Sequence, residues 1–362
     1  MQKMTGRERV MASLHGQECD RLCWSPVIDN YFTSSLPAQG FQRTNWQDAY
    51  RLVGADIIER HTPTIQAVED DTIKRKFSGD GNRKVELIET PVGSLTIERG
   101  TNAWEAAHIM RFPIHTIADI QTWEYIVEHT HQRQDFSAFL EHDRSIGADG
   151  IATTSSPMTP LMQFMENLGG IQDTYYLLAD HPAEMQACLE LMLARNQETF
   201  QLIVQGPEEV VITYEDTSST ILSPAVYRKF CAPVLDEYAN ICHAAGKLFL
   251  THMCGKLSAF NAQLKAGLQD GIESVCPPTT GDIWAYEARA AWGDEKLIVG
   301  GLEPSALERM TVDETTAYVT RILDQMPTFR RFILGTGDAT AHATPVANLR
   351  AISELVEHYP WK

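Results

Sequence analysis

An imidazole and a thiol lie two residues apart directly after an apolar segment of the sequence. The segment 247–251 is followed by His252 and Cys254, and Gly255 comes next. Imidazole nitrogen and thiolate sulfur are ligands that zinc prefers. If the segment is a strand that opens onto a group of acids, we expect His252 and Cys254 to bind a metal ion. Otherwise they are a core histidine beside a buried thiol.

Several later residues are candidates for a third metal ligand. Glu273 and Cys276 lie at the end of the predicted strand 271–275, and Asp338 follows the last predicted strand. A catalytic zinc ion commonly has three protein ligands and one open position. The Cys276 thiol matches this chemistry best, but the two prolines that follow it can turn it away. The residues alone leave Asp338, Glu273 and Cys276 as alternatives.

Two further loops carry side chains that can contact a substrate. Glu215 and Asp216 follow a β-branched segment, and we expect them to act as a general base, to hold a substrate hydroxyl or to supply a metal ligand. The alternatives for this pair are that one acid caps the helix beginning near Ser223 or accepts hydrogen bonds from neighbouring loops. Ser155 and Met158 predict a pocket wall, whereas the alternative is a helix cap followed by core. Tyr214 is a candidate substrate contact or a packing residue.

Strands and helices alternate along most of the chain, and this pattern has to position these residues. Strand-like segments occur at 22–28, 55–59, 150–154, 210–214, 247–251, 271–275, 296–299 and 331–334. The alternation predicts a parallel sheet, and eight repeats predict a closed (β/α)8 TIM barrel, with a doubly wound sheet as the alternative. In such a barrel the chemistry gathers at the carboxyl ends of the strands.

Two parts of the chain depart from this alternation. Residues 5–15 predict an N-terminal helix with Thr5 as its cap. Between 63 and 110, polar and apolar residues alternate around Gly79 and Gly81, which is typical of β-hairpins. We interpret this stretch as a hairpin insertion within a single domain that spans residues 1–362.

The composition restricts the partners of the protein. Its 362 residues include 48 acids against 30 lysines and arginines, a net charge of −18. Such a surface repels nucleic acid and anionic membranes. No run reaches the ~20 apolar residues that a membrane span needs. The seven scattered cysteines and a polar N-terminus without the apolar part of a signal peptide predict a cytoplasmic protein with reduced thiols.

Several short motifs resemble those of the uroporphyrinogen decarboxylase superfamily over nearly the whole chain. They are found at 5–10 with 19–24, 252–256, 271–274 with 280–282, 300–304, and 344–345 with 348–349. The resemblance implies a (β/α)8 barrel and permits a homodimer. The decarboxylases of the superfamily bind a polycarboxylated porphyrinogen through an arginine-rich N-terminal segment. The equivalent stretch 25–31 contains no arginine.

The chain is more similar to the zinc methyltransferases of the superfamily, which work with corrinoid proteins. His252 and Cys254 match their His-x-Cys signature, and Asp338 lies where their later cysteine is expected. The resemblance implies zinc bound by His252, Cys254 and an acid. It also implies a small methyl donor or acceptor, and cobalamin on a corrinoid partner protein. The Met- and Phe-rich segment 158–165 predicts a methoxylated aromatic as the donor. A metal-free decarboxylase and a non-catalytic binding barrel are the alternatives.

Overall fold

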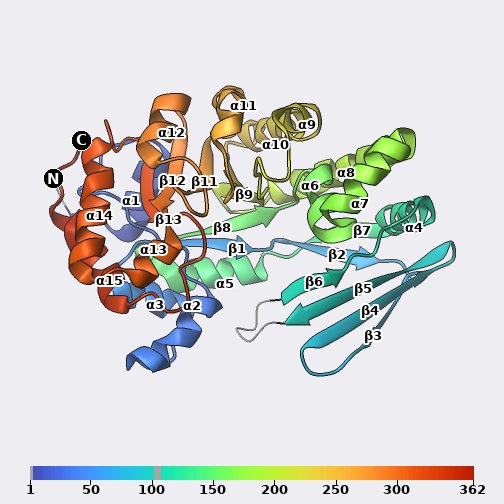
Figure 1. The fold of residues 1–362 in the computed structure, drawn as a ribbon, viewed down its shortest axis with the longest axis horizontal. Coiled ribbons are helices and arrows are strands. Elements are labelled where there is room, and N and C mark those ends of the chain that lie inside the picture. The colour runs from blue at the N-terminus through green and yellow to red at the C-terminus, as the bar shows by residue number, and fades with distance from the viewer. Residues whose placement is uncertain (1–2, 102–106) are drawn as a thin grey trace.

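A curled sheet of seven parallel strands forms the centre of the structure (Figure 1). The computed structural model describes residues 3–101 and 107–362. The strands lie side by side in chain order, as β1 (Ile57–Thr62), β8 (Gly150–Ser156), β9 (Val210–Tyr214), β10 (Leu248–His252), β11 (Gly271–Val275), β12 (Leu297–Leu302) and β13 (Phe332–Thr336). Because every neighbouring pair is parallel, all the carboxyl ends meet at one edge of the sheet.

The first strand that the sequence predicts is an extended segment joined to the sheet by isolated bridges. Trp24 forms a parallel bridge with Leu334, and its carbonyl oxygen accepts from the Asp56 amide at 2.8 Å. Pro26 has no amide N–H, so it cannot continue the ladder. The α/β class with a curled parallel sheet is confirmed. In the described structure these bridges stand in place of the eighth strand that the predicted closed barrel requires.

Helices follow most of the strands and pack around the sheet, as the alternating pattern predicts (Figure 1). They are α1 (Gly6–Leu14), α2 (Asn30–Ser35), α3 (Trp46–Val53), α5 (Ser137–Ile146), α6 (Pro160–Gln163), α7 (Gly170–Asp180), α8 (Pro182–Ile203), α9 (Pro224–Phe230), α10 (Ala232–Ala244), α11 (Asn261–Ala266), α12 (Ala285–Trp292), α13 (Pro304–Arg309), α14 (Val312–Gln325) and α15 (Val346–His358). Short turns are η1 (Leu36–Gln39), η2 (Gly147–Asp149), the π-helical η3 (Phe164–Leu168) and η4 (Ser258–Phe260). Within the described ranges, none of these helices has both the length and the apolar character to cross a bilayer.

Helix α1 packs against the sheet through apolar residues. Thr5 caps the helix and forms a reciprocal capping box with Glu8. Val10 and Leu14 belong to the same buried cluster as strand residues such as Ile212. The predicted N-terminal helix is therefore confirmed, and its packing leaves the carboxyl edge of the sheet for the site.

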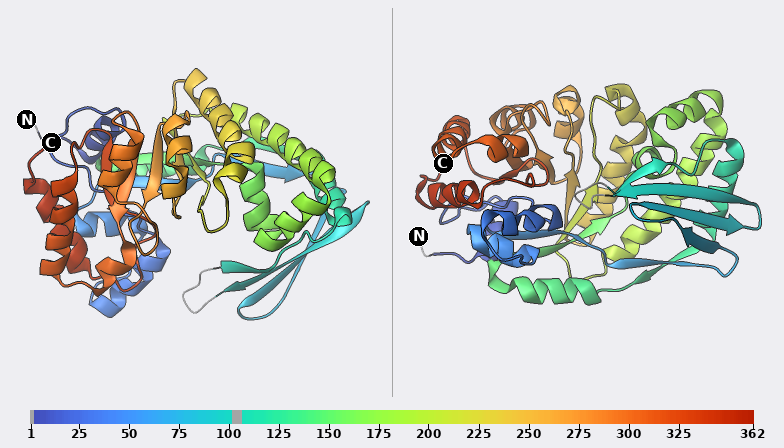
Figure 2. Two further views of the ribbon diagram at one scale, coloured as in Figure 1. Left: turned by 45° about the horizontal axis from the view of Figure 1, so that its top comes forward. Right: turned by 60° about the horizontal axis from the view of Figure 1, so that its bottom comes forward.

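The stretch between β1 and α4 (Ile117–Glu128) forms the predicted β-rich insertion, with more strands than a single hairpin. A four-stranded antiparallel sheet contains β3 (Lys74–Ser78), β4 (Arg83–Thr90), β5 (Gly93–Thr101) and β6 (Ala107–Arg111). It extends away from the central sheet (Figure 2). A separate antiparallel pair joins β2 (Ile65–Glu69) to β7 (Thr130–Gln134). The sequence did not predict β7, because its residues lack apolar alternation.

Candidate metal centre

Three side chains at neighbouring strand ends bring their ligand atoms together. The carboxylate of Asp216, the imidazole of His252 and the thiol of Cys254 all lie within 4.8 Å of one another. Asp216 Oδ1 is 3.7 Å from His252 Nε2 and accepts from the Cys254 thiol at 3.4 Å. The structure thus joins the predicted His-x-Cys pair to an acid from the preceding strand.

Strand pairing explains why these three residues converge. In the β9–β10 register Tyr214 lies opposite His252, so the residues that follow the two strands are neighbours. The His252 carbonyl oxygen accepts from the Asp216 amide at 3.2 Å. Asp216 itself has φ 39°, in the left-handed region that non-glycine residues rarely adopt. Such strain is concentrated at functional sites, and here it turns the Asp216 side chain toward His252 and Cys254.

Gly255 allows the loop after β10 to lie close to the loop after β9. A Cβ atom at this position would lie 2.4 Å from the Ser218 Cβ and 2.5 Å from the Thr217 carbonyl oxygen. No side chain fits in that space, so a glycine directly after Cys254 is required for the close approach. This contact gives a physical reason for the Cys-Gly dipeptide in the sequence.

Glu273 and Arg60 hold the imidazole of His252 from behind. His252 Nδ1 is bonded to Glu273 Oε2, and Glu273 Oε1 accepts from Arg60 Nε at 3.0 Å. Burial alone would raise the pKa of Glu273, but the charges of His252 and Arg60 outweigh it and lower this pKa to about 2. Both carboxylate oxygens of Glu273 are therefore engaged by His252 and Arg60. Because Glu273 is bonded to Nδ1 of His252, the other ring nitrogen, Nε2, faces Asp216 and Cys254.

The remaining predicted ligands, Asp338 and Cys276, lie near this cluster but outside it in the described structure. Asp338 is close enough for His252 and Asp216 to affect its pKa, which burial raises above the usual value. Cys276 packs against the backbone of Gly337, where an added Cβ would lie 2.6 Å from its sulfur. Burial raises the pKa of the Cys276 thiol to about 12. Their assignment as metal ligands stays a prediction.

The two acids after β9 point to different places. Unlike Asp216, Glu215 is fully buried, and its carboxylate accepts from the Thr159 amide at 2.8 Å and from the Thr159 hydroxyl at 3.1 Å. Burial raises the pKa of Glu215 to about 8, although the bonds from Thr159 act in the opposite direction. Glu215 therefore anchors the loop that follows β8, and its predicted role as a catalytic base stays a prediction.

The raised pKa of Glu215 predicts how stability changes with pH. Between pH 4.5 and about 8 the folded state keeps a proton that the unfolded state has lost, so stability falls as the pH rises through this window. We expect Glu215→Gln to remove a decrease of roughly 3 kcal/mol between pH 5 and 8. Thermal melting with a chelator present measures it. The exposed acid variant Glu209→Gln is the control, and an unchanged slope in Glu215→Gln would contradict the expectation.

Glu166 is an acid at the site that sequence reasoning missed. It lies in the π-helix η3, and its Oε1 atom is buried with no hydrogen-bond partner among the described residues. Burial and the negative charges of Asp216 and Glu215 raise the pKa of Glu166 to about 9. It is the one acid among the apolar and amide side chains of 161–168, and this was the signal that could have identified it. A single-turn π-helix is also frequent at functional sites.

Tyr214 packs against the candidate metal ligand His252 from one side. Its ring centroid is 4.8 Å from that of His252 and 4.8 Å from that of His61, on which it stacks. Its hydroxyl donates to the Arg60 carbonyl oxygen at 2.8 Å. Tyr214 thus fixes the position of the His252 ring, and its contact with a substrate stays a prediction. Arg60 and His61, both at the end of β1, were not identified from the sequence.

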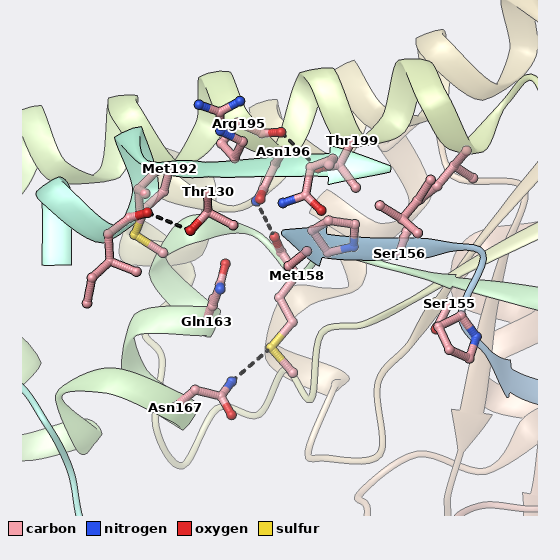
Figure 3. Close-up of a pocket in the computed structure, with 18 of the residues that line it drawn as sticks. Thr130, Ser155, Ser156, Met158, Gln163, Asn167, Met192, Arg195, Asn196 and Thr199 are labelled. Carbon is pink, nitrogen blue, oxygen red and sulfur yellow. Dashed lines mark hydrogen bonds between the residues drawn. The ribbon is translucent and has the colours of Figure 1, made fainter. Parts of the chain in front are cut away.

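Ser155 and Met158 line a cavity of about 520 Å³ beside this cluster (Figure 3). The loop that carries them turns back at Thr159, which is bonded to Glu215. The two residues that the sequence proposed for a pocket wall therefore share one cavity. The loop and η3 separate this cavity from the cluster of Asp216, His252 and Cys254.

A sequence profile described as uroporphyrinogen decarboxylase (URO-D) matches residues 110–359. The chain belongs to the URO-D family. The family that the sequence motifs predict is thereby confirmed. A methyltransferase from Methanosarcina mazei is similar in structure, with a TM-score of 0.63 and 15% sequence identity over 99% of each chain. At that identity the likeness shows a shared fold.

A second solved structure is similar to this URO-D family member at a lower level. The putative vitamin-B12 independent methionine synthase from Listeria monocytogenes has a TM-score of 0.42 and 10% sequence identity. The match covers 94% of this chain and 97% of that one. No curated protein matches the chain in sequence.

The donor set of this URO-D family member fits a zinc ion. One carboxylate, one imidazole and one thiol match the ligand types of catalytic zinc sites, which use three protein ligands. Without a cation, burial and the charges of Asp216 and Asp338 raise the pKa of the Cys254 thiol. A bound dication would reverse this effect, because metal binding favours the thiolate.

Proposed function

We propose that this chain is a zinc-dependent methyltransferase that moves a methyl group between a small substrate and the cobalamin of a corrinoid protein. The observation that carries the proposal is the convergence of Asp216, His252 and Cys254 at the carboxyl edge of a parallel sheet. The shared fold with a protein named as a methyltransferase supports it. We further propose a methoxylated aromatic as the methyl donor.

In this proposal each residue of the site has a separate role. Asp216, His252 and Cys254 would hold the zinc ion. When bound, zinc would act as a Lewis acid that polarises the oxygen atom carrying the methyl group. Glu273 and Arg60 keep the His252 imidazole in one tautomer and one orientation.

Two further acids act behind this cluster. Glu166 holds a proton beside the Asp216 carboxylate, because two neighbouring buried carboxylates do not both ionise readily. Glu215 fixes the loop after β8 through its two bonds from Thr159. The bonds from Thr159 thereby fix the residue that directly precedes Asp216.

The acidic character of the site disfavours a decarboxylase that acts on a polycarboxylate. Three acids lie close together here. The charge of Asp216 affects the pKa values of both Glu166 and Asp338. The buried Arg60 is already engaged by Glu273. A substrate with several carboxylates would meet repulsion here without a free cationic partner among these residues.

Methyl transfer itself tests the proposal. The zinc-loaded chain is incubated with cob(I)alamin and 1,2-dimethoxybenzene, and the absorbance change that accompanies formation of methylcobalamin is followed. We expect turnover that stops after zinc is removed with a chelator and returns when zinc is added. The proposal is overturned if a chain that retains zinc transfers no methyl group, either to free cobalamin or to corrinoid proteins.

The role of Glu273 gives a separate prediction on metal affinity. In Glu273→Gln the side chain keeps its shape but loses the charge that pairs with His252 and Arg60. We expect zinc affinity to fall about 10–100-fold, as for other outer partners of histidine ligands. Competition with a chromophoric chelator measures it. Asp270→Asn, which changes the carboxylate paired with His243, is the matched control and keeps full affinity. Equal affinities in the two variants would contradict the expectation.

A further inference from the structure

Strand β1 contains a β-bulge where it reaches the carboxyl edge of the sheet. Between Glu59 and Thr62, β1 advances three residues while its neighbour β8 advances two, so β1 holds one extra residue. The residues inside this bulge are Arg60 and His61. Bulges are frequent next to active sites, where they re-aim a side chain. The side chains of Arg60 and His61 therefore need not alternate between the two faces of the sheet.

Both side chains of the bulge turn to the inner side of the curled sheet. Arg60 pairs with Glu273 of β11, although three strands lie between β1 and β11 in the sheet. His61 stacks on Tyr214 of β9, and Tyr214 packs on the buried cluster of strand residues that contains Ile212. Consecutive side chains of a regular strand point to opposite faces. The bulge thus brings His61 to the face on which Arg60 already lies.

His61 is open to a ligand at this position. It is the exposed residue of β1, and the other five residues of the strand are buried. Its ring centroid is 4.8 Å from that of Tyr214, and the Tyr214 centroid is 4.8 Å from that of His252. One tyrosine ring therefore separates His61 from a candidate metal ligand. A molecule with one substituted ring is long enough to lie along Tyr214 and to contact both ends of this row.

The hydrogen-bond network assigns the tautomer of the His61 ring. The Tyr214 hydroxyl donates its only hydrogen to the Arg60 carbonyl oxygen at 2.8 Å. Toward His61 Nε2, which is 3.5 Å away, the hydroxyl oxygen is therefore the acceptor, and Nε2 carries the hydrogen. Burial lowers the pKa of His61, although the charge of Glu59 acts in the opposite direction, so the ring is neutral near neutral pH. Nδ1 is then an acceptor, and it has no hydrogen-bond partner within the described ranges.

We propose that His61 determines the specificity of this site, with Nδ1 accepting a hydrogen bond from a hydroxyl group of the molecule held at the metal. One oxygen of that molecule lies at the candidate metal centre, its ring along Tyr214 and its hydroxyl group at His61. A methoxyl group in place of the hydroxyl leaves Nδ1 without a partner, which disfavours that analogue. The inference rests on the proposed function, because there the bound molecule is the methyl donor. It narrows that donor to methyl ethers that also carry a hydroxyl group.

Calorimetric titration of the full chain, purified under reducing conditions, measures this selectivity without any need for catalysis. The probes are 2-methoxyphenol and 4-methoxyphenol, each compared with the dimethoxybenzene of the same substitution pattern. We expect a methoxyphenol to bind at least about threefold more tightly than its dimethoxy analogue, which is the contribution of one hydrogen bond. Binding of both dimethoxybenzenes that is as tight as that of the phenols, or tighter, would overturn the proposal.

Substitution of His61 assigns the preference to its ring nitrogen. His61→Phe keeps a ring that can stack on Tyr214 but has no acceptor, so we expect methoxyphenol binding to weaken about three- to tenfold and dimethoxybenzene binding to stay the same. His61→Asn has an amide oxygen near the position of Nδ1 and keeps part of the preference. His115→Phe, which changes a histidine paired with Asp173, is the control and keeps it in full. Zinc content and melting curves check that all three variants are folded. A preference that persists in His61→Phe comes from another group, such as the metal ion, and contradicts the assignment.

The outcomes separate this inference from the proposed function. If the preference for the phenol is lost in His61→Phe while no methyl group is transferred in any assay, the role of His61 in binding stands and the proposed function fails. If zinc-dependent methyl transfer is observed but the preference is absent or is unchanged in His61→Phe, the role of His61 fails and the proposed function stands.

Discussion

We expect substitution of His252 by alanine to remove bound zinc from the protein. We expect the native chain, purified under reducing conditions, to carry about one zinc ion and the His252→Ala variant to carry almost none. The imidazole Nε2 is one of only three ligand atoms in the described cluster, and its ring is fixed by Glu273 and Tyr214. Loss of a direct ligand must cost more than the ~10–100-fold that loss of an outer partner costs. Elemental analysis of the purified proteins measures the metal content.

A matched histidine variant controls for indirect effects. His115 also pairs with a carboxylate, that of Asp173, but it lies outside the cluster. His115→Ala should keep the full zinc content, and melting curves check that both variants fold. A native chain that holds no zinc under reducing conditions, or a His252→Ala variant that keeps it, would contradict the assignment.

Cys254 supplies a second readout of the same prediction. It is the partly exposed thiol among seven free cysteines, and the other six are buried. An alkylating reagent should therefore label Cys254 first in the metal-free chain. Zinc should protect it in the native protein and should fail to protect it in His252→Ala. Mass spectrometry of the labelled peptide distinguishes Cys254 from the buried thiols.

The sequence predicted the position of the site because strand ends are encoded locally. The apolar run before His252 and the β-branched run before Asp216 each predict a strand, and parallel strands place their carboxyl ends together. The His-x-Cys pair could therefore be placed at one edge of the sheet without a structure. The same reasoning predicted the helix that begins after Thr5, since its cap is formed by residues close in sequence.

Other features could not be predicted because they depend on packing between distant residues. The left-handed backbone of Asp216 turns this acid into the cluster, whereas its neighbour Glu215 turns toward Thr159. No local pattern distinguishes two consecutive acids in this way. Arg60 is 213 residues from Glu273 in the chain, so their ion pair is visible only in the fold. The same holds for Glu166 in η3, which only the fold brings close to Asp216.

Asp216 and Asp338 are competing candidates for the third metal ligand. Motif spacing favours Asp338, whereas the geometry places the Asp216 carboxylate within the cluster. We expect Asp216→Asn to lower zinc affinity by more than ~100-fold, because a neutral amide is a poor replacement for a carboxylate ligand. Asp338→Asn should lower it less than about tenfold, because it removes only a nearby negative charge. Chelator competition at constant ionic strength measures both affinities.

The pair of variants decides the assignment because the substitutions are chemically identical. Each replaces one carboxylate oxygen by an amide nitrogen, so any difference between them reflects position alone. A larger loss in Asp338→Asn would show that the loop after β13 supplies the ligand when metal binds. A carboxylate at either position gives zinc one hard ligand in place of a second thiolate, and this leaves the ion a stronger Lewis acid. The double variant should then retain no measurable zinc, since the His252 and Cys254 ligands alone cannot complete a three-ligand site.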